Sequence, residues 1–153
     1  MKKFSGSASQ NPPSILLVDD NVHGLIARKN VLKDLGCEIS TATSGEEALV
    51  LISQRKFDLI ITDYKMVEMN GTELIAQVRR SWPGIPIILL SGFVEPLGLT
   101  EQSTGADVVL SKSAGEVGHL IHSVSRLLPR PILRKKPSAA QNQAMNKSAK
   151  SAS

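Results

Sequence analysis

Polar side chains that could carry chemistry follow four apolar segments, each at the point where the segment ends. The apolar run 59–61 leads into Asp63, and the other three runs lead into Asp19 and Asp20, into Ser91, and into Lys112. Short runs with few polar interruptions are typical of strands that are buried on both faces of a sheet. Open α/β sheets place their reactive groups at the carboxyl ends of such strands. We therefore expect these five side chains to meet at one edge of a parallel sheet.

The three carboxylates of this set predict a cation site. Carboxylates that lie close together cannot all ionise cheaply unless a cation is present. A sparse set of oxygen ligands with room for water suits Mg²⁺ better than Ca²⁺. Asp19 and Asp20 alone could equally cap the helix that follows them, since Asp is a good N-cap residue. With Asp63, Ser91 and Lys112 in register, the pair favours a metal site.

The same residues predict phosphoryl transfer to an aspartate. A carboxylate beside Mg²⁺ can act as a nucleophile toward phosphorus and form an acyl phosphate. Such a transfer mainly needs neutralisation of the charge on the phosphoryl oxygens. We expect Mg²⁺, the ammonium group of Lys112, and the Ser91 hydroxyl with nearby backbone N–H groups to share this task.

Strands and helices alternate along the chain and predict an α/β fold. Apolar runs predict five strands, near residues 14–18, 37–41, 58–62, 85–90 and 107–110. Helical spacing predicts helices near residues 22–35, 44–54, 72–81 and 114–128, and a weak, short one between Gly92 and Gly105. Five alternations in about 115 residues indicate a parallel sheet with helices on both faces.

Spacing within the helices predicts which side chains face the sheet. One face of the first helix should hold Val22, Leu25, Ile26, Lys29 by its stem, and Leu32. One face of the last helix should hold Val117, Leu120, Ile121, Val124 and Leu127. Ser44 followed by Glu47 predicts a capping box at the start of the second helix.

Length and composition suit one folded domain with tails. The chain has 153 residues, of which 41% are hydrophobic. We place the domain at residues 14–128, after a flexible leader at 1–13 and before a basic, disordered tail at 129–153. Cys37 is the only cysteine, so no intramolecular disulfide can form. No signal peptide is visible, and no apolar run approaches the roughly 20 residues of a membrane helix. These features indicate a cytoplasmic protein.

Positive charge is concentrated outside the domain. Residues 14–128 hold all 14 acidic residues and ten of the 18 Lys and Arg, a net charge of −4, although the whole chain carries +4. The remaining eight basic residues lie in the two flanks. The tail has no aromatic residue on which a base could stack. Nucleic acid is therefore not an expected partner.

The segment from Ile15 to Leu128 resembles the receiver domain of two-component response regulators. The resemblance rests on the motifs Leu17-Val18-Asp19-Asp20-Asn21, Asp58-Leu59-Ile60-Ile61-Thr62-Asp63-Tyr64-Lys65-Met66, Asn70-Gly71, Ile87-Ile88-Leu89-Leu90-Ser91-Gly92, Gly105-Ala106-Asp107 and Ser111-Lys112. Each motif is weak alone, but their order and spacing together are specific. The resemblance implies a flavodoxin-like fold of five parallel strands in the order 2-1-3-4-5, with the site at the topological switch point. It also implies a stand-alone signalling switch that is no enzyme beyond its own phosphoryl transfer and autodephosphorylation.

The resemblance also assigns a role to each residue of the site. Asp63 would be the phosphoacceptor, taking the group from a phosphohistidine of a sensor histidine kinase or histidine phosphotransferase. Asp20, Asp63 and the backbone carbonyl of Lys65 would bind Mg²⁺, and Asp19 would hold it through water. Ser91 would be the switch hydroxyl, and Lys112 would pair with the phosphoryl group. A downstream protein would read the face built from the fourth helix, the fifth strand and the last helix.

Three positions depart from the family pattern. Val109 stands where an aromatic switch residue is usual, Ser113 follows the lysine where proline is usual, and Val67 replaces another common proline. A cis bond before Ser113 would cost roughly 3–4 kcal/mol, against about 0.5–1 kcal/mol before proline. That loop is therefore expected to be either trans or strained. None of the reactive groups is missing, so the resemblance still implies phosphorylation.

Other functions fit part of these features. A phosphorelay shuttle would pass the group from Asp63 to a second histidine. A phosphorylation-independent interaction module would keep the acidic residues without using them, and Val109 and Ser113 slightly favour it. A Mg²⁺-dependent phosphohydrolase is disfavoured, because no cap domain and no general acid beside Asp63 is evident. His119 and His122 are spaced i, i+3, but no carboxylate or cysteine repeats that spacing, and we interpret them as surface or half-buried residues.

Overall fold

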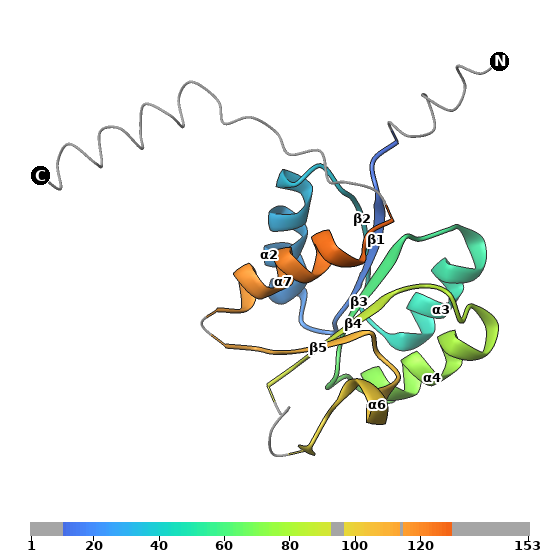
Figure 1. The fold of residues 1–153 in the computed structure, drawn as a ribbon. Helices are drawn as coiled ribbons and strands as arrows, with labels where there is room; N and C mark the ends of the chain where they lie inside the picture. Colours follow the sequence, from blue (N-terminus) through green and yellow to red (C-terminus); the bar gives the residue numbers. More distant parts are fainter. Residues whose placement is uncertain (1–10, 93–96, 114, 130–153) are drawn as a thin grey trace, which may run out of the picture.

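Five parallel strands form the centre of the molecule and occupy the order β2-β1-β3-β4-β5 (Figure 1). The computed structural model describes residues 11–92, 97–113 and 115–129. The strands are β1 (Ser14–Val18), β2 (Glu38–Ala42), β3 (Leu59–Asp63), β4 (Ile87–Ser91) and β5 (Val108–Ser111). Fold class, strand order and parallel pairing are as the sequence predicts. Most of the predicted leader and nearly all of the predicted tail (1–10 and 130–153) lie outside the described residues.

The two central strands β3 and β4 are buried along their whole length. Their apolar runs therefore belong to strands covered on both faces, as expected for a parallel sheet. Strand β2 at the edge is only partly buried. In the register of the sheet, Asp63 lies opposite Leu90 and Ser91 lies opposite Ser111. The polar ends of the strands are thus brought to one edge.

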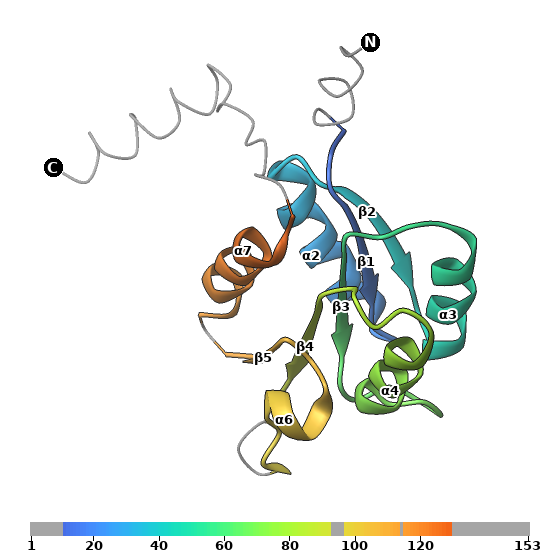
Figure 2. The ribbon, with the colours of Figure 1, turned by 45° about the vertical axis from the view of Figure 1, so that its right-hand side comes forward.

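Helices cover both faces of the sheet. They are α2 (Val22–Asp34), α3 (Gly45–Gln54), α4 (Gly71–Ser81), α6 (Glu101–Thr104) and α7 (Glu116–Leu127). One hydrophobic core joins α2 and α7 to the sheet, and a second joins α3 and α4 to the opposite face (Figures 1 and 2). Neighbouring residues of β1 alternate between the two cores, with Leu16 in one and Leu17 in the other. This alternation follows from the period of two in a strand.

The predicted short helix before β5 is the single turn α6, which ends at Gly105 with a left-handed φ of 81°. Residues 93–96, which fall in the same predicted stretch, lie outside the described residues. Ala114, the predicted start of the last helix, lies outside them as well, and α7 begins at Glu116. The Lys112–Ser113 peptide bond is trans, since the described part of the chain contains no cis bond.

One predicted helix cap is wrong in detail. Ser44 accepts a hydrogen bond from the Glu47 N–H, as predicted. The Glu47 carboxylate, however, accepts from the backbone N–H and hydroxyl of Thr43, at 2.7 and 3.1 Å, rather than from Ser44. The Glu47 carboxylate thus bonds two donors of Thr43 in place of the single backbone N–H of Ser44. A complete capping box instead starts α4, where Asn70 and Glu73 bond each other's backbone.

The predicted inner faces of the first and last helices need correction. Val22 and Ile26 of α2 and Val117 of α7 were expected to face the sheet, but about half of each is exposed (53%, 53% and 52%). Leu25 and Leu32 of α2 are buried as expected, and so are Leu120 and Val124 of α7. On α2 the stripe from Leu25 to Leu32 passes through residue 28, not residue 26, because neighbours on one helix face are three or four residues apart. The inner stripe of α2 therefore contains an arginine.

The first residue of α4 allows a close approach of this helix to the end of β3. A Cβ atom on Gly71 would lie 2.5 Å from the Asp63 carbonyl oxygen and 2.7 Å from Leu89 Cδ1. The Gly71 N–H also donates to the Tyr64 carbonyl at 2.7 Å. A side chain at this position would push the helix away from the strand end that carries Asp63.

We therefore expect Gly71→Ala to lower the free energy of unfolding by roughly 1–3 kcal/mol through overpacking. Gly84→Ala is the matched control, because a Cβ there meets no atom within 4 Å. It should stay within about 0.5 kcal/mol of the parent protein. Urea unfolding of the two variants measures the difference. Equal stabilities would contradict the close contact between α4 and the end of β3.

Candidate functional site

The five predicted side chains line one cleft at the carboxyl edge of the sheet. The cleft has a volume of about 250 Å³ and is lined by Asp19, Asp20, Asn21, Asp63, Lys65, Ser91, Gly92 and Lys112. Parallel pairing of β1, β3, β4 and β5 brings the ends of these strands together, and Figure 2 shows the arrowheads of β1 and β3 pointing to the same edge. The sheet alone therefore explains why residues up to 93 positions apart share a site.

The three carboxylates form a compact oxygen cluster. One oxygen from each of Asp19, Asp20 and Asp63 lies within 4.8 Å of the others. Asp19 and Asp63 are buried, while Asp20 is exposed to solvent. A partly open set of three carboxylates fits a hard divalent ion that keeps several of its waters, which is how Mg²⁺ binds to proteins. The donor chemistry of the cleft thus matches the predicted cofactor.

The surroundings of Asp63 disfavour its charged form. Burial raises its pKa above the usual aspartate value, and the nearby Asp19 carboxylate adds to this rise. The ammonium group of Lys112 contacts Asp63 Oδ1 directly, and this hydrogen bond works in the opposite direction without cancelling the effect of burial. The pKa of Asp63 is therefore raised, because burial penalises the charged form more than its neighbours favour it.

Hydrogen bonds fix the other groups around Asp63. The exposed Asp20 accepts a bond from the Val67 N–H at 3.2 Å, which ties the loop after β3 to the end of β1. Ser91 is buried at the end of β4. Its carbonyl accepts the Lys112 N–H at 2.9 Å. The serine and the lysine are thus held side by side at the ends of neighbouring strands.

Arg28 and Glu116 also belong to this site, although no motif in the sequence predicted them. Nη1 of Arg28 donates to Asp19 Oδ2 at 2.9 Å, and Nε donates to Glu116 Oε2 at 2.8 Å. All three side chains are largely buried. A possible signal was a basic residue on the apolar stripe of a helix, with Gly24 one turn before it. An arginine in such a place needs a buried acid as its partner.

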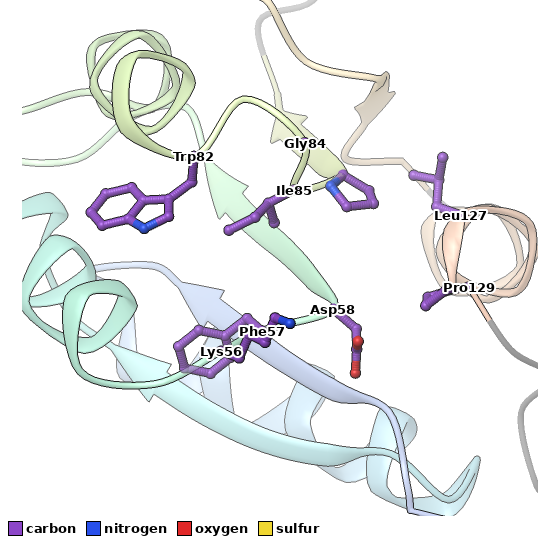
Figure 3. Close-up of a pocket in the computed structure, with 9 residues that line it drawn as sticks. Lys56, Phe57, Asp58, Trp82, Gly84, Ile85, Leu127 and Pro129 are labelled. Carbon is purple, nitrogen blue, oxygen red and sulfur yellow. The ribbon is translucent and has the colours of Figure 1, made fainter. Parts of the chain in front are cut away.

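A second, larger cleft lies at the opposite end of the strands and has a different character. It has a volume of about 450 Å³, and its lining includes Phe57, Trp82, Ile85 and Leu127 (Figure 3). Asp58 is its only acidic residue, and one of its carboxylate oxygens accepts the Ser14 N–H at 2.8 Å. This cleft has no cluster of ligands for a cation. His119 and His122 are exposed, and the aspartate trio is the one possible metal cluster within the described ranges.

Comparison with known proteins decides the family. Residues 15–124 match the response regulator receiver domain. The chain belongs to this family. Over 84 residues it is 39% identical to the transcriptional regulatory protein GlrR of Escherichia coli (strain K12). That match covers 54% of this chain but only 19% of GlrR, so it concerns a small part of the relative.

Solved receiver structures share the fold. The chemotaxis protein CheY4 of Vibrio cholerae is 30% identical with a TM-score of 0.69, and the match covers 76% of this chain and 99% of CheY4. The response regulator TrrA of Thermotoga maritima, solved in complex with Mg²⁺–BeF, is 32% identical with the same TM-score and the same coverage. Receiver domains bind Mg²⁺ at an acidic pocket, and this receiver has a cluster of three aspartates at the carboxyl edge of its sheet. The chain is thus the receiver of a two-component signalling system.

The raised pKa of Asp63 predicts how stability depends on pH without metal. A carboxyl whose pKa is higher in the folded state stabilises the fold fully below its unfolded pKa, and this contribution is lost as the pH rises through the folded pKa. At neutral pH the ionised Asp63 therefore destabilises the metal-free receiver. We expect Asp63→Asn to raise the Tm at pH 7 by a few degrees.

The gain from Asp63→Asn should shrink as the pH falls toward the usual aspartate pKa of about 3.9, where both proteins carry a neutral group. Thermal unfolding in a chelator between pH 3.5 and 8 measures this difference. Asp34→Asn, at the exposed last residue of α2, is the control for the loss of one acidic charge, and its gain at pH 7 should be smaller than that of Asp63→Asn. A gain that is equal at every pH would contradict the electrostatic cause.

Proposed function

We propose that Asp63 accepts a phosphoryl group from a phosphohistidine of a sensor histidine kinase or a histidine phosphotransferase, in a Mg²⁺-dependent reaction. The observation that supports this most strongly is the convergence of three carboxylates and one lysine in a single cleft. Family membership supports a signalling switch in general, and the assignment of Asp63 as the acceptor is our own inference. Its buried place at the end of β3, between Lys112 and the other two acids, makes it the central carboxylate.

Four groups would hold the metal ion. They are the carboxylates of Asp20 and Asp63, the backbone carbonyl of Lys65 and, through water, the carboxylate of Asp19. When bound, Mg²⁺ supplies neutralising charge for a phosphoryl oxygen. Lys65 lines the cleft, and the bond from the Val67 N–H to Asp20 keeps its loop close to the acidic pair.

The transfer itself needs little covalent chemistry from the protein. A carboxylate oxygen of Asp63 forms a bond to phosphorus while the P–N bond of the phosphohistidine breaks. The imidazole nitrogen leaves with the electron pair and takes up a proton from solvent. Lys112, which contacts Asp63 before transfer, is placed to follow the new negative charge onto the phosphoryl oxygens. Ser91 would donate its hydroxyl to another of these oxygens.

Phosphorylation would act by shifting a two-state equilibrium and thereby changing partner binding. The proposed output face consists of α6, β5 and α7. Val109 on this face is half-buried, and its N–H donates to the Glu101 carboxylate of α6 at 3.1 Å. Among the described residues, β5 has Val109 where an aromatic ring is usual, and one contact that joins Ser91 to this face is the backbone bond from the Lys112 N–H to the Ser91 carbonyl. None of the described helices is long and apolar enough to cross a membrane.

The phosphorelay shuttle uses the same first step and differs only in a later transfer from Asp63 to a second histidine. The phosphorylation-independent module is disfavoured because the acceptor carboxylate, the lysine that contacts it and the other two aspartates are all kept in one cleft. The division into a leader at 1–13, a receiver at 14–128 and a basic tail at 129–153 stays a proposal.

The acceptor is tested by intact mass after incubation with Mg²⁺ and a small phosphodonor such as phosphoramidate. We expect one added phosphoryl group in the parent protein and in the Asp34→Asn control. Asp63→Asn, and the parent protein in a chelator, should gain none. An adduct that persists in Asp63→Asn would show that another residue is the acceptor. Absence of both adduct and metal binding would leave the interaction module as the better reading.

Lys112→Met tests the electrostatic role of the lysine. It removes the cation that faces Asp63, so phosphorylation should slow by about 100-fold, as on loss of a donor that stabilises a developing charge. Metal binding should be kept or strengthened, because the variant removes a positive charge from the cleft. Stopped-flow phosphorylation and a Mg²⁺ titration on one preparation separate the two effects. Unchanged phosphorylation would place Lys112 outside the reaction.

A further inference from the structure

Arg28 joins the acidic cleft to the last helix through two short ion pairs. Its Nη1 lies 2.9 Å from Asp19 Oδ2, and its Nε lies 2.8 Å from Glu116 Oε2. The exposed fractions of the three side chains are only 13%, 4% and 19%. Water screens such a network far less than it screens a surface pair. One guanidinium thus connects the end of β1 with the first residue of α7.

The backbone around Arg28 is built to admit this network. A Cβ atom on Gly24, one turn earlier on α2, would lie 3.0 Å from Arg28 Nη1 and 3.1 Å from Asp19 Oδ2. Any side chain there would crowd both partners of the ion pair. Glycine near the start of a helix costs up to about 1 kcal/mol relative to alanine. The chain carries this cost at a position where a side chain would crowd the ion pair.

The network occupies the oxygens of Asp19. Oδ1 accepts the Asn21 N–H at 2.9 Å, and Oδ2 accepts from Arg28. A divalent ion drawn to the three aspartates must therefore share Asp19 with a cation that is already in place. Two positive groups that compete for one carboxylate weaken each other's binding.

We propose that Arg28 is a positioning residue that couples metal binding in the cleft to α7. When a divalent ion attracts the Asp19 carboxylate, the bond from Arg28 to Asp19 weakens. The bond from Arg28 to Glu116, which holds the start of α7, then changes as well. This inference rests on the metal site of the proposed function and deepens it. Thermodynamic linkage makes the coupling reciprocal, so breaking the network must change the affinity for the metal.

The shape of the guanidinium matters as much as its charge. Arg28 presents nitrogens in different directions and so bonds Asp19 and Glu116 at once, whereas a lysine is a single point charge on a shorter stem. Arg28→Lys therefore keeps a positive charge near the cleft but loses the bridge. Arg28→Met removes both. Glu116→Gln leaves Arg28 in place and weakens only the arm toward α7.

The experiment is a Mg²⁺ titration of each variant by calorimetry, with ¹H–¹⁵N spectra that follow the α7 amides of residues 116–127. In the parent protein we expect these amides to shift with the same saturation curve as the heat signal. Arg28→Met should bind Mg²⁺ on the order of tenfold more tightly, within the range of typical couplings. Arg28→Lys keeps the positive charge but loses the bridge, so its Mg²⁺ affinity should fall between those of the parent protein and Arg28→Met, and both variants should lose most of the α7 shift.

Arg55→Met is the matched control, since Arg55 pairs with Glu38 at 3.6 Å on an exposed surface. It should reproduce the parent protein in both readouts. If Mg²⁺ binds but the α7 amides of the parent protein do not shift, or if they shift as strongly in Arg28→Lys and Glu116→Gln as in the parent protein, the coupling is wrong while the metal site stands. If the parent protein binds no Mg²⁺, the metal site and the coupling both fall. Should Arg28→Met not fold, the Lys and Gln variants still decide the question.

Discussion

Repulsion among three carboxylates at one edge of the sheet is the constraint on which the site depends. Asp19, Asp20 and Asp63 lie close together, and two of them are buried. Burial and the charge of Asp19 raise the pKa of Asp63, and Lys112 and Arg28 offset only part of this cost. A cleft that is strained without a cation has free energy available to bind one, and after it a phosphoryl group. The same carboxylate repulsion therefore destabilises the metal-free cleft and favours the binding of a cation.

The surrounding fold holds the three carboxylates together against their repulsion. Strands β3 and β4 are buried from end to end, so the aspartate and the serine stand on rigid supports. Gly71 lets α4 pack directly against the end of β3, and the bond from Val67 to Asp20 holds the intervening loop. Loops alone would let the carboxylates move apart and relieve their repulsion. The sheet and these contacts prevent that relief.

Much of this could be predicted from the sequence, because apolar runs and strand ends are local signals. The runs before Asp63 and Ser91 predicted buried parallel strands, and the shared register of such strands predicted the cleft. The inner faces of α2 and α7 were predicted less well, since apolar spacing assigned Ile26 and Val117 to the core. The true stripe of α2 passes through Arg28, whose partner Glu116 is 88 residues away. No local pattern predicts a pairing between residues so far apart in the sequence. Gly24, one turn before Arg28, is a local feature that relates to it, because it leaves room for the ion pair.

Because Val109 stands where a switch aromatic is usual, the ion-pair network of Arg28 becomes the candidate route from the cleft to α7. A receiver that signals by turning an aromatic ring needs that ring on β5, and this chain has a half-buried valine there, with its N–H fixed to Glu101. The first residue of α7 is instead held by a buried ion pair that ends on Asp19 in the cleft. A buried pair of charges has strict geometry and is strongly destabilised when one partner is drawn away. Under the proposed coupling, a metal ion that competes for Asp19 would thus act strongly on this contact. The response of this receiver should therefore be sought at the start of α7.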